Sequence, residues 1–165
     1  MPESADFESI LRALDAAGVE FVLIGGLALV VHGGSRATVD VDLVYGRGED
    51  NLARLARALA PFRPWLRGAA RELPFVLDAE TLRSGLNFTL ASDAGDINLL
   101  GEVPGLGDFA AARATSENLD LYGCSIAILS LEGLARSKRA AGRAKDLLDL
   151  ATIAALQAER GDPAP

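Results

Sequence analysis

The chain contains very little cysteine and histidine. Cys124 is the only cysteine among 165 residues, and His32 is the only histidine. A single cysteine excludes an intramolecular disulfide and is typical of a protein in a reducing compartment. We interpret Cys124 as a small core residue on a strand. A single histidine leaves a histidine-rich metal site, or a histidine-based catalytic triad with cysteine, without support.

Long hydrophobic runs are also missing. The longest apolar stretch, residues 19–31, is too short to span a bilayer and is interrupted by Gly25-Gly26. The N-terminus carries Glu3, Asp6 and Glu8 and lacks the basic and then apolar pattern of a secretory signal. We therefore expect a cytoplasmic protein with no membrane partner.

Acidic residues outnumber basic ones. The chain has 16 basic and 23 acidic residues, a net charge of −7. A chain this acidic cannot hold nucleic acid through its overall field, so such contact requires a local basic patch. One candidate patch for such contact is a group of five arginines: Arg54, Arg57, Arg63, Arg67 and Arg71. The same arginines would equally be scattered over the surface without forming a patch.

The patterns that are present predict one compact domain over residues 1–165, of the α/β (α+β) class. Helices are expected in six segments: about 7–17 with Ser4 or Asp6 as the cap, 27–32, 50–60, a one- to two-turn helix between a cap at Asp78 and Gly85, one that begins after a cap at Ser130, and about 144–158. Strand patterns occupy residues 19–24, 39–44, 86–91 and 96–100, and two short strands are expected around Tyr122-Gly123. This order favours a mixed β-sheet flanked by helices, with a core at about 19–128 and a C-terminal helical tail at about 130–158.

Two acidic residues alternate with apolar ones in the second predicted strand. Asp40 and Asp42 project to the same face because side chains in a strand alternate with a period of two. Two neighbouring carboxylates repel each other, and burying them unpaired is costly. A divalent cation resolves both problems, because Mg²⁺ takes carboxylate and phosphate oxygens in one octahedron. Asp96, which opens a later strand, becomes a third ligand if the two strands are neighbours.

A glycine pair precedes these aspartates. Gly25-Gly26 lies between a predicted strand and a short helix, where the backbone can approach a phosphate closely. The N–H groups at the start of that helix would face the anion. A glycine pair followed about fourteen residues later by Asp-apolar-Asp on a strand is far more specific than either motif alone.

These residues together resemble a known superfamily. Gly25-Gly26, the string Arg36-x-Thr38-x-Asp40-x-Asp42 and Asp96 look like the minimal nucleotidyltransferase superfamily, which has the fold of DNA polymerase β. The C-terminal string over residues 138–150 is similar to the tail of the abortive-infection (AbiEii-like) nucleotidyltransferase toxins and related bacterial domains. The resemblance spans nearly the whole chain, at about residues 19–156.

The resemblance implies transfer of a nucleoside monophosphate from a nucleoside triphosphate to a hydroxyl, with pyrophosphate leaving. On that analogy Asp40 and Asp42 ligate Mg²⁺ or Mn²⁺, and Asp96 binds a metal or acts as base for the acceptor. The phosphate contacts come from the glycine pair and from three residues of the tail: Lys138, Arg143 and Lys145. The acceptor implied is tRNA, another RNA or a protein, and the setting is a toxin–antitoxin pair with a cognate antitoxin protein.

Each of these assignments has a plainer alternative. Asp40 and Asp42 would also suit a solvent-exposed edge strand, and Asp96 an ordinary turn. Arg36 either contacts substrate or anchors its loop by pairing with a carboxylate. The basic residues of the tail would equally form a solvated face that is ion-paired with Asp146 and Asp149.

Two alternatives remain for the function. Many members of the superfamily have serine after the glycine pair, where this chain has Leu27. That difference, together with the small size, favours a non-catalytic nucleotide-binding or regulatory module of the same fold. The other alternative is an interaction protein whose carboxylates carry out no metal chemistry. The nucleotide used and the oligomeric state have no signal in the sequence.

Overall fold

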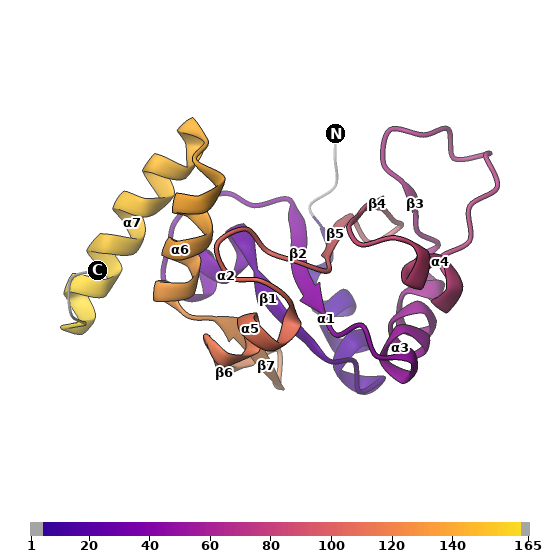
Figure 1. The fold of residues 1–165 in the computed structure, drawn as a ribbon, viewed down its shortest axis with the longest axis horizontal. Helices are drawn as coiled ribbons and strands as arrows, with labels where there is room; N and C mark the ends of the chain where they lie inside the picture. The colour runs from indigo at the N-terminus through magenta and orange to yellow at the C-terminus, as the bar shows by residue number, and fades with distance from the viewer. Residues whose placement is uncertain (1–4, 163–165) are drawn as a thin grey trace.

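The computed structural model describes residues 5–162 and contains a seven-stranded mixed sheet (Figure 1). Its strands follow the spatial order β3-β4-β5-β2-β1-β7-β6. The strands are β1 (Phe21–Ile24), β2 (Asp40–Tyr45), β3 (Trp65–Leu66), β4 (Phe88–Ala91), β5 (Asp96–Leu100), β6 (Ser116–Leu121) and β7 (Cys124–Leu129). A mixed sheet flanked by helices confirms the predicted fold class.

Several of the helices begin after a short polar side chain that caps their first turn. They are α1 (Phe7–Ala16), α2 (Gly25–Val31), α3 (Glu49–Leu59), α4 (Ala79–Ser84), α5 (Phe109–Ala114), α6 (Leu131–Ala141) and α7 (Ala144–Arg160). Asp6 accepts a hydrogen bond from the Ser9 amide at 3.0 Å, and Ser130 accepts one from the Gly133 amide at 3.1 Å. Each bond satisfies an amide that the first helical turn would otherwise leave unpaired.

The centre of the sheet is deeply buried. β2 lies between β1, to which it is antiparallel, and β5, to which it is parallel. Val22, Leu43 and Leu99 of these three strands have no exposed surface. The hydrophobic core therefore holds the same strands that carry the acidic motifs.

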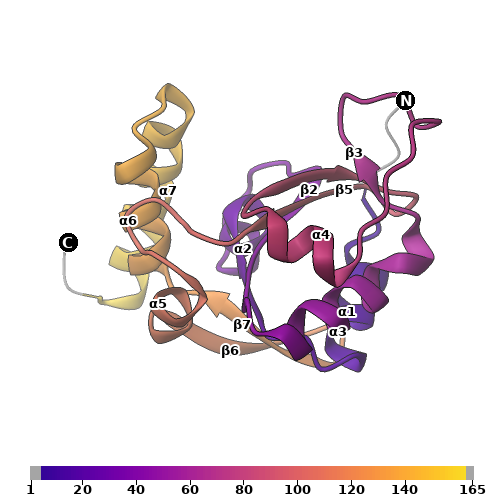
Figure 2. The same cartoon turned by 45° about the vertical axis from the view of Figure 1, so that its right-hand side comes forward.

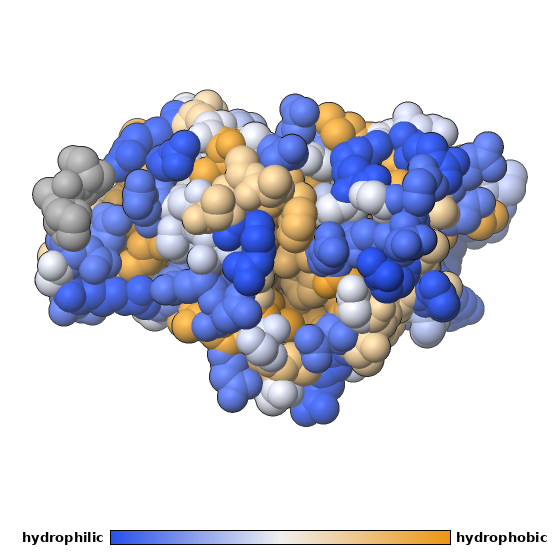
Figure 3. Space-filling view, turned by 60° about the horizontal axis from the view of Figure 1, so that its bottom comes forward, coloured by the Kyte–Doolittle hydropathy of each residue, from blue (hydrophilic) through white to orange (hydrophobic). Residues whose placement is uncertain are grey.

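The two ends of the molecule are built from different helices. α6 and α7 pack against each other at one end, and α3 and α4 lie at the other, with α1 packed on α3 (Figures 1 and 2). A space-filling view shows apolar side chains gathered in the middle of one face, with hydrophilic side chains on both sides (Figure 3). Within residues 5–162, no helix combines the length and the apolar character needed to cross a membrane.

The observed elements differ from the predicted ones at α2, β3 and α5 in ways that have a physical reason. α2 begins at Gly25, two residues early, because the positive φ of +72° at Gly25 turns the chain directly from β1 into the helix. β3 was not predicted, since a strand of two residues shows no period. α5 was not predicted either, because its alanine-rich sequence follows a glycine-rich segment and has no apolar stripe.

Candidate active site

Two carboxylates lie side by side at the start of β2. Asp40 and Asp42 are half-buried on one side of the strand, whereas Val41 and Leu43 are fully buried on the other. Parallel pairing with β5 then places Asp96 beside Asp40. The three predicted carboxylates therefore occupy the beginnings of two adjacent strands. Both strands are interior in the sheet, so the alternative of an edge strand for Asp40 and Asp42 is wrong.

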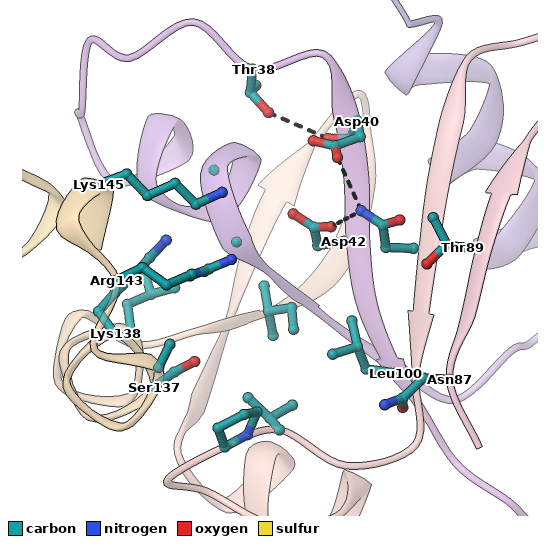
Figure 4. A pocket seen from close by; sticks show the side chains of 18 of the residues that line it. Thr38, Asp40, Asp42, Asn87, Thr89, Leu100, Ser137, Lys138, Arg143 and Lys145 are labelled. Atoms are coloured by element: carbon teal, nitrogen blue, oxygen red, sulfur yellow. Dashed lines mark hydrogen bonds between the residues drawn. The ribbon is translucent and has the colours of Figure 1, made fainter. Parts of the chain in front are cut away.

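Asn98 joins the two carboxylates of β2. Its Nδ2 donates hydrogen bonds to Oδ2 of Asp40 at 3.0 Å and to Oδ1 of Asp42 at 2.5 Å (Figure 4). Its Oδ1 accepts a hydrogen bond from Nη2 of Arg67 at 3.1 Å. Asn98 was not predicted from the sequence, although its place two residues after Asp96 puts it on the same face of β5 and was a usable signal.

The surroundings of Asp42 disfavour its charge. Burial raises the pKa of Asp42, because desolvation penalises the carboxylate form, and the nearby Asp40 carboxylate adds to this effect. The hydrogen bond from Asn98 acts in the opposite direction but does not cancel the rise. A positive charge beside the pair would favour the carboxylate form, as the more distant Lys138 and Arg67 already do in part.

Asp96 sits beside the pair but is held by an arginine. Nε of Arg67 lies 3.3 Å from Oδ2 of Asp96, and the side chain of Asp96 is 41% exposed. Arg67 also donates to the backbone carbonyl of Leu90 at 2.8 Å. Arg67, which follows β3, thus contacts both β4 and β5, and no sequence pattern had indicated its role in the site.

The glycine pair lets α2 approach β2 closely. A Cβ added to Gly25 would lie 2.2 Å from Oδ2 of Asp42, and one added to Gly26 would lie 3.0 Å from Oγ1 of Thr38. Leu27, the residue after the pair, is 5% exposed and belongs to the hydrophobic core. The glycines therefore face the acidic site, whereas Leu27 is directed into the core.

A cleft of about 800 Å³ opens beside this acidic motif. Its walls come from the start of α2, from residues 36–40, from β4 and β5, and from α6 and α7. Lys138, Arg143 and Lys145 line the side opposite Asp40 and Asp42, and in Figure 4 Arg143 and Lys145 reach toward that acidic side. All the predicted site residues except Asp96 line this cleft. His32 lies outside it, buried, with Nε2 at 2.8 Å from the carbonyl of Leu129.

Ion pairs to two buried aspartates, Asp146 and Asp149, join the helices of the tail to each other and to the loop that carries Arg36. Nζ of Lys138 lies 2.8 Å from Oδ2 of Asp149 and 3.4 Å from Oδ1 of Asp146. Arg36 forms an ion pair with the same Asp149, and Nε of Arg143 lies 2.9 Å from Oδ2 of Asp146. Arg36 thus anchors its loop to a carboxylate of α7 while lining the cleft.

These pairs keep the acidic residues of α7 ionised. The hydrogen bond from Arg143 lowers the pKa of Asp146 to about 2, against the effect of burial. Burial alone would raise the pKa of Asp149, but hydrogen bonds and charges from Lys138 and Arg36 hold it below its ordinary value. Lys138 and Arg143 are therefore ion-paired as the plainer alternative predicted, but their carboxylate partners are buried instead of solvated, and both basic residues also line the cleft.

The site suits a cation that is shared with a ligand. Among residues 5–162, no group of three or more His, Cys, Asp or Glu side chains forms a complete metal cage. Asp40 and Asp42 nevertheless converge on one atom, Nδ2 of Asn98. Mg²⁺ is commonly held by one or two carboxylates together with substrate phosphates. The donor set therefore fits Mg²⁺ or Mn²⁺ bound jointly with a triphosphate.

Comparison with solved structures identifies the fold. ANT(2″)-Ia, in a complex with adenylyl-2″-tobramycin, is 16% identical with a TM-score of 0.58, covering 92% of this chain and 88% of that chain. A candidate nucleotidyltransferase from Thermotoga maritima is 16% identical with a TM-score of 0.55, covering 86% of both chains. An antigenic nucleotidyltransferase-like protein from Paracoccidioides brasiliensis is 17% identical with a TM-score of 0.56, covering 93% of this chain and 78% of that chain. At these identities the likeness establishes the nucleotidyltransferase fold.

The family assignment comes from the sequence. No curated protein matches the chain significantly. The family of the nucleotidyl transferase AbiEii toxin of Type IV toxin–antitoxin systems matches residues 9–98, more than half of the chain. This match includes the glycine pair and all three predicted carboxylates. The chain therefore belongs to the AbiEii family of nucleotidyl transferase toxins and is a nucleotidyltransferase.

Proposed function

We propose that this toxin moves a nucleoside monophosphate from a nucleoside triphosphate to a hydroxyl of RNA, tRNA included, or of a protein, with Mg²⁺ or Mn²⁺. The observation that carries the proposal is the pairing of Asp40 and Asp42 in a cleft whose opposite wall is basic. A triphosphate brings several negative charges and needs both a cation site and basic side chains. The cleft offers candidate residues for both within one molecule.

The residues divide into two groups by position. Asp40 and Asp42 would hold the cation, which when bound neutralises phosphate charge and orients the triphosphate. Lys138, Arg143 and Lys145 line the opposite wall and would bind the phosphate oxygens. The phosphates would lie between these walls, beside the backbone of the glycine pair.

Asp96 suits a role toward the acceptor. Its side chain is 41% exposed, so an incoming hydroxyl can reach it. A carboxylate there can accept the proton of the attacking hydroxyl or join the cation, and either role requires release from Arg67. The pyrophosphate would depart along the basic wall.

The comparisons support transfer of a nucleotide to a hydroxyl, but they do not favour one acceptor molecule over another. ANT(2″)-Ia, which shares the fold, is in complex with adenylyl-2″-tobramycin, an adenylylated molecule. The Type IV toxin–antitoxin family implies a cognate antitoxin, and we propose that both proteins work in the cytoplasm. The net charge of −7 restricts contact with RNA to a local basic surface.

The non-catalytic module is the weaker hypothesis. It was motivated by Leu27 in place of serine, but the core position of Leu27 takes that residue away from the cleft. The basic wall would provide phosphate contacts from another part of the chain. Membership of a family of nucleotidyl transferases also favours turnover.

The test is transfer of each of the four labelled nucleoside triphosphates, with Mg²⁺ or Mn²⁺, to total bacterial RNA and protein. An Asp40→Ala, Asp42→Ala double variant is the control, and nuclease or protease treatment identifies the labelled product. We expect label with the wild type alone, and only when a divalent cation is present. Nucleotide binding without transfer to either acceptor would instead favour the module.

A further inference from the structure

Asn98 occupies the space between the two metal-ligand candidates. A single nitrogen lies within 3.0 Å of Asp40 and 2.5 Å of Asp42, so one donor group satisfies both carboxylates. Mg²⁺ bound to the same two oxygens would lie about 2.1 Å from each, in the same narrow space. The amide and the cation cannot both occupy it.

We propose that Asn98 is a positioning residue that holds Asp40 and Asp42 together in the metal-free protein and has to release them when a divalent cation binds. The inference rests on the proposed function, since it takes the pair to be the cation site. Its amide relieves part of the repulsion between the carboxylates through charge-assisted hydrogen bonds. The same bonds compete with the cation and weaken its binding.

Arg67 restrains the amide in its blocking orientation. Oδ1 of Asn98 accepts from Nη2 of Arg67 at 3.1 Å, on the side away from the carboxylates. A guanidinium only donates and a carboxylate only accepts, so one orientation of the amide satisfies both neighbours. Turning the amide over would offer its oxygen to a cation but would set two donor groups against each other at Arg67.

The same arginine couples the third carboxylate to this release. Nε of Arg67 lies 3.3 Å from Oδ2 of Asp96, so Arg67 restrains both Asn98 and Asp96. Movement of Arg67 would free the amide to turn and Asp96 to approach the cation. In this arrangement Asp96 joins the site only after Arg67 has let go of Asn98.

The test is direct Mn²⁺ binding without nucleotide, measured by electron paramagnetic resonance of free Mn²⁺, together with the Tm of the metal-free protein. We expect Asn98→Ala to bind Mn²⁺ about five- to tenfold more tightly, because two hydrogen bonds to charged groups no longer have to be broken. Its metal-free Tm should fall, because the carboxylate repulsion is no longer relieved. Asn118→Ala, on exposed β6, is the matched control and should bind as the wild type does.

Arg67→Lys is a second variant. It keeps the positive charge at this position and leaves Asp40 and Asp42 unchanged. It cannot hold Asn98 and Asp96 with one planar group, so we expect tighter Mn²⁺ binding here too. Unchanged or weaker binding by both variants, with a wild type that does bind Mn²⁺, would overturn this inference alone. Mn²⁺ binding that is absent from the wild type, with or without nucleotide, would overturn both this inference and the metal dependence of the proposed function.

Discussion

Replacing Gly25 by alanine tests whether the close approach of α2 to β2 keeps Asp42 in place. The new Cβ would lie 2.2 Å from Oδ2 of Asp42 and 2.9 Å from its Cβ and Cγ. Ordinary contacts between such atoms are about 3.5 Å, so the Asp42 side chain has to move by about 1 Å. A misplacement of about 1 Å at a reacting centre can reduce turnover about 100-fold. The φ of +72° adds backbone strain of about 1–2 kcal/mol for alanine.

The strain and the displacement can be separated with a second glycine. Gly123, between β6 and β7, has a φ of +77°, and no atom lies within 4 Å of the Cβ that alanine would add. Gly123→Ala should therefore show a similar loss in the free energy of unfolding, measured in urea, with unchanged transfer of labelled nucleotide. Gly25→Ala should lose both stability and activity. Transfer by a folded Gly25→Ala protein within about threefold of Gly123→Ala would refute the reasoning, since a displaced ligand should cost far more.

Three further predictions concern the charges of the site. Asp42→Asn should raise the metal-free Tm at pH 7 by a few degrees, because burial disfavours the charged form, while transfer falls at least about 100-fold; a lower Tm in calorimetry would contradict this. Lys138→Met should lower the free energy of unfolding by about 1–3 kcal/mol in urea, because the buried Asp149 loses one of its two cationic partners and keeps only Arg36, whereas Lys145→Met, at an exposed position, should change it by less than about 1 kcal/mol. Because the pKa of Asp146 is lowered to about 2, the stability that its pair with Arg143 adds should be complete above about pH 4 and lost as the pH falls toward 2. In Arg143→Gln, the urea unfolding midpoint should depend less on pH over this range. A loss of stability as steep as in the wild type would contradict the role given to the Arg143–Asp146 pair.

The predicted elements were accurate where the pattern was local. The period of two in β2 identified Asp40 and Asp42 as neighbours on one face, and the structure places them so. The caps at Asp6, Asp78 and Ser130 were readable because each acts on an amide three residues away. These features depend on a few consecutive residues, which the sequence displays directly.

The site required information that no local pattern carries. Parallel pairing of β2 with β5 sets Asp96 beside Asp40 and Asn98 beside Asp42, across more than fifty residues of chain. A shift of one residue in this pairing would have turned Asn98 to the opposite face of the sheet. Arg67 lies in a segment with three prolines nearby and no period, so its contacts with the site could only be seen after folding.

The sequence by itself determined the fold class, the family and the acidic motif, because each depends on residue spacing along one element or on motifs within it. Only the tertiary structure decided which charges meet: Lys138 and Arg36 with Asp149, and Asn98 with the carboxylate pair. The physical reason is the distance along the chain between the residues that interact. Backbone geometry sets the direction of a side chain within its own element, whereas the partner across a cleft is set by the packing of elements that are distant in the chain.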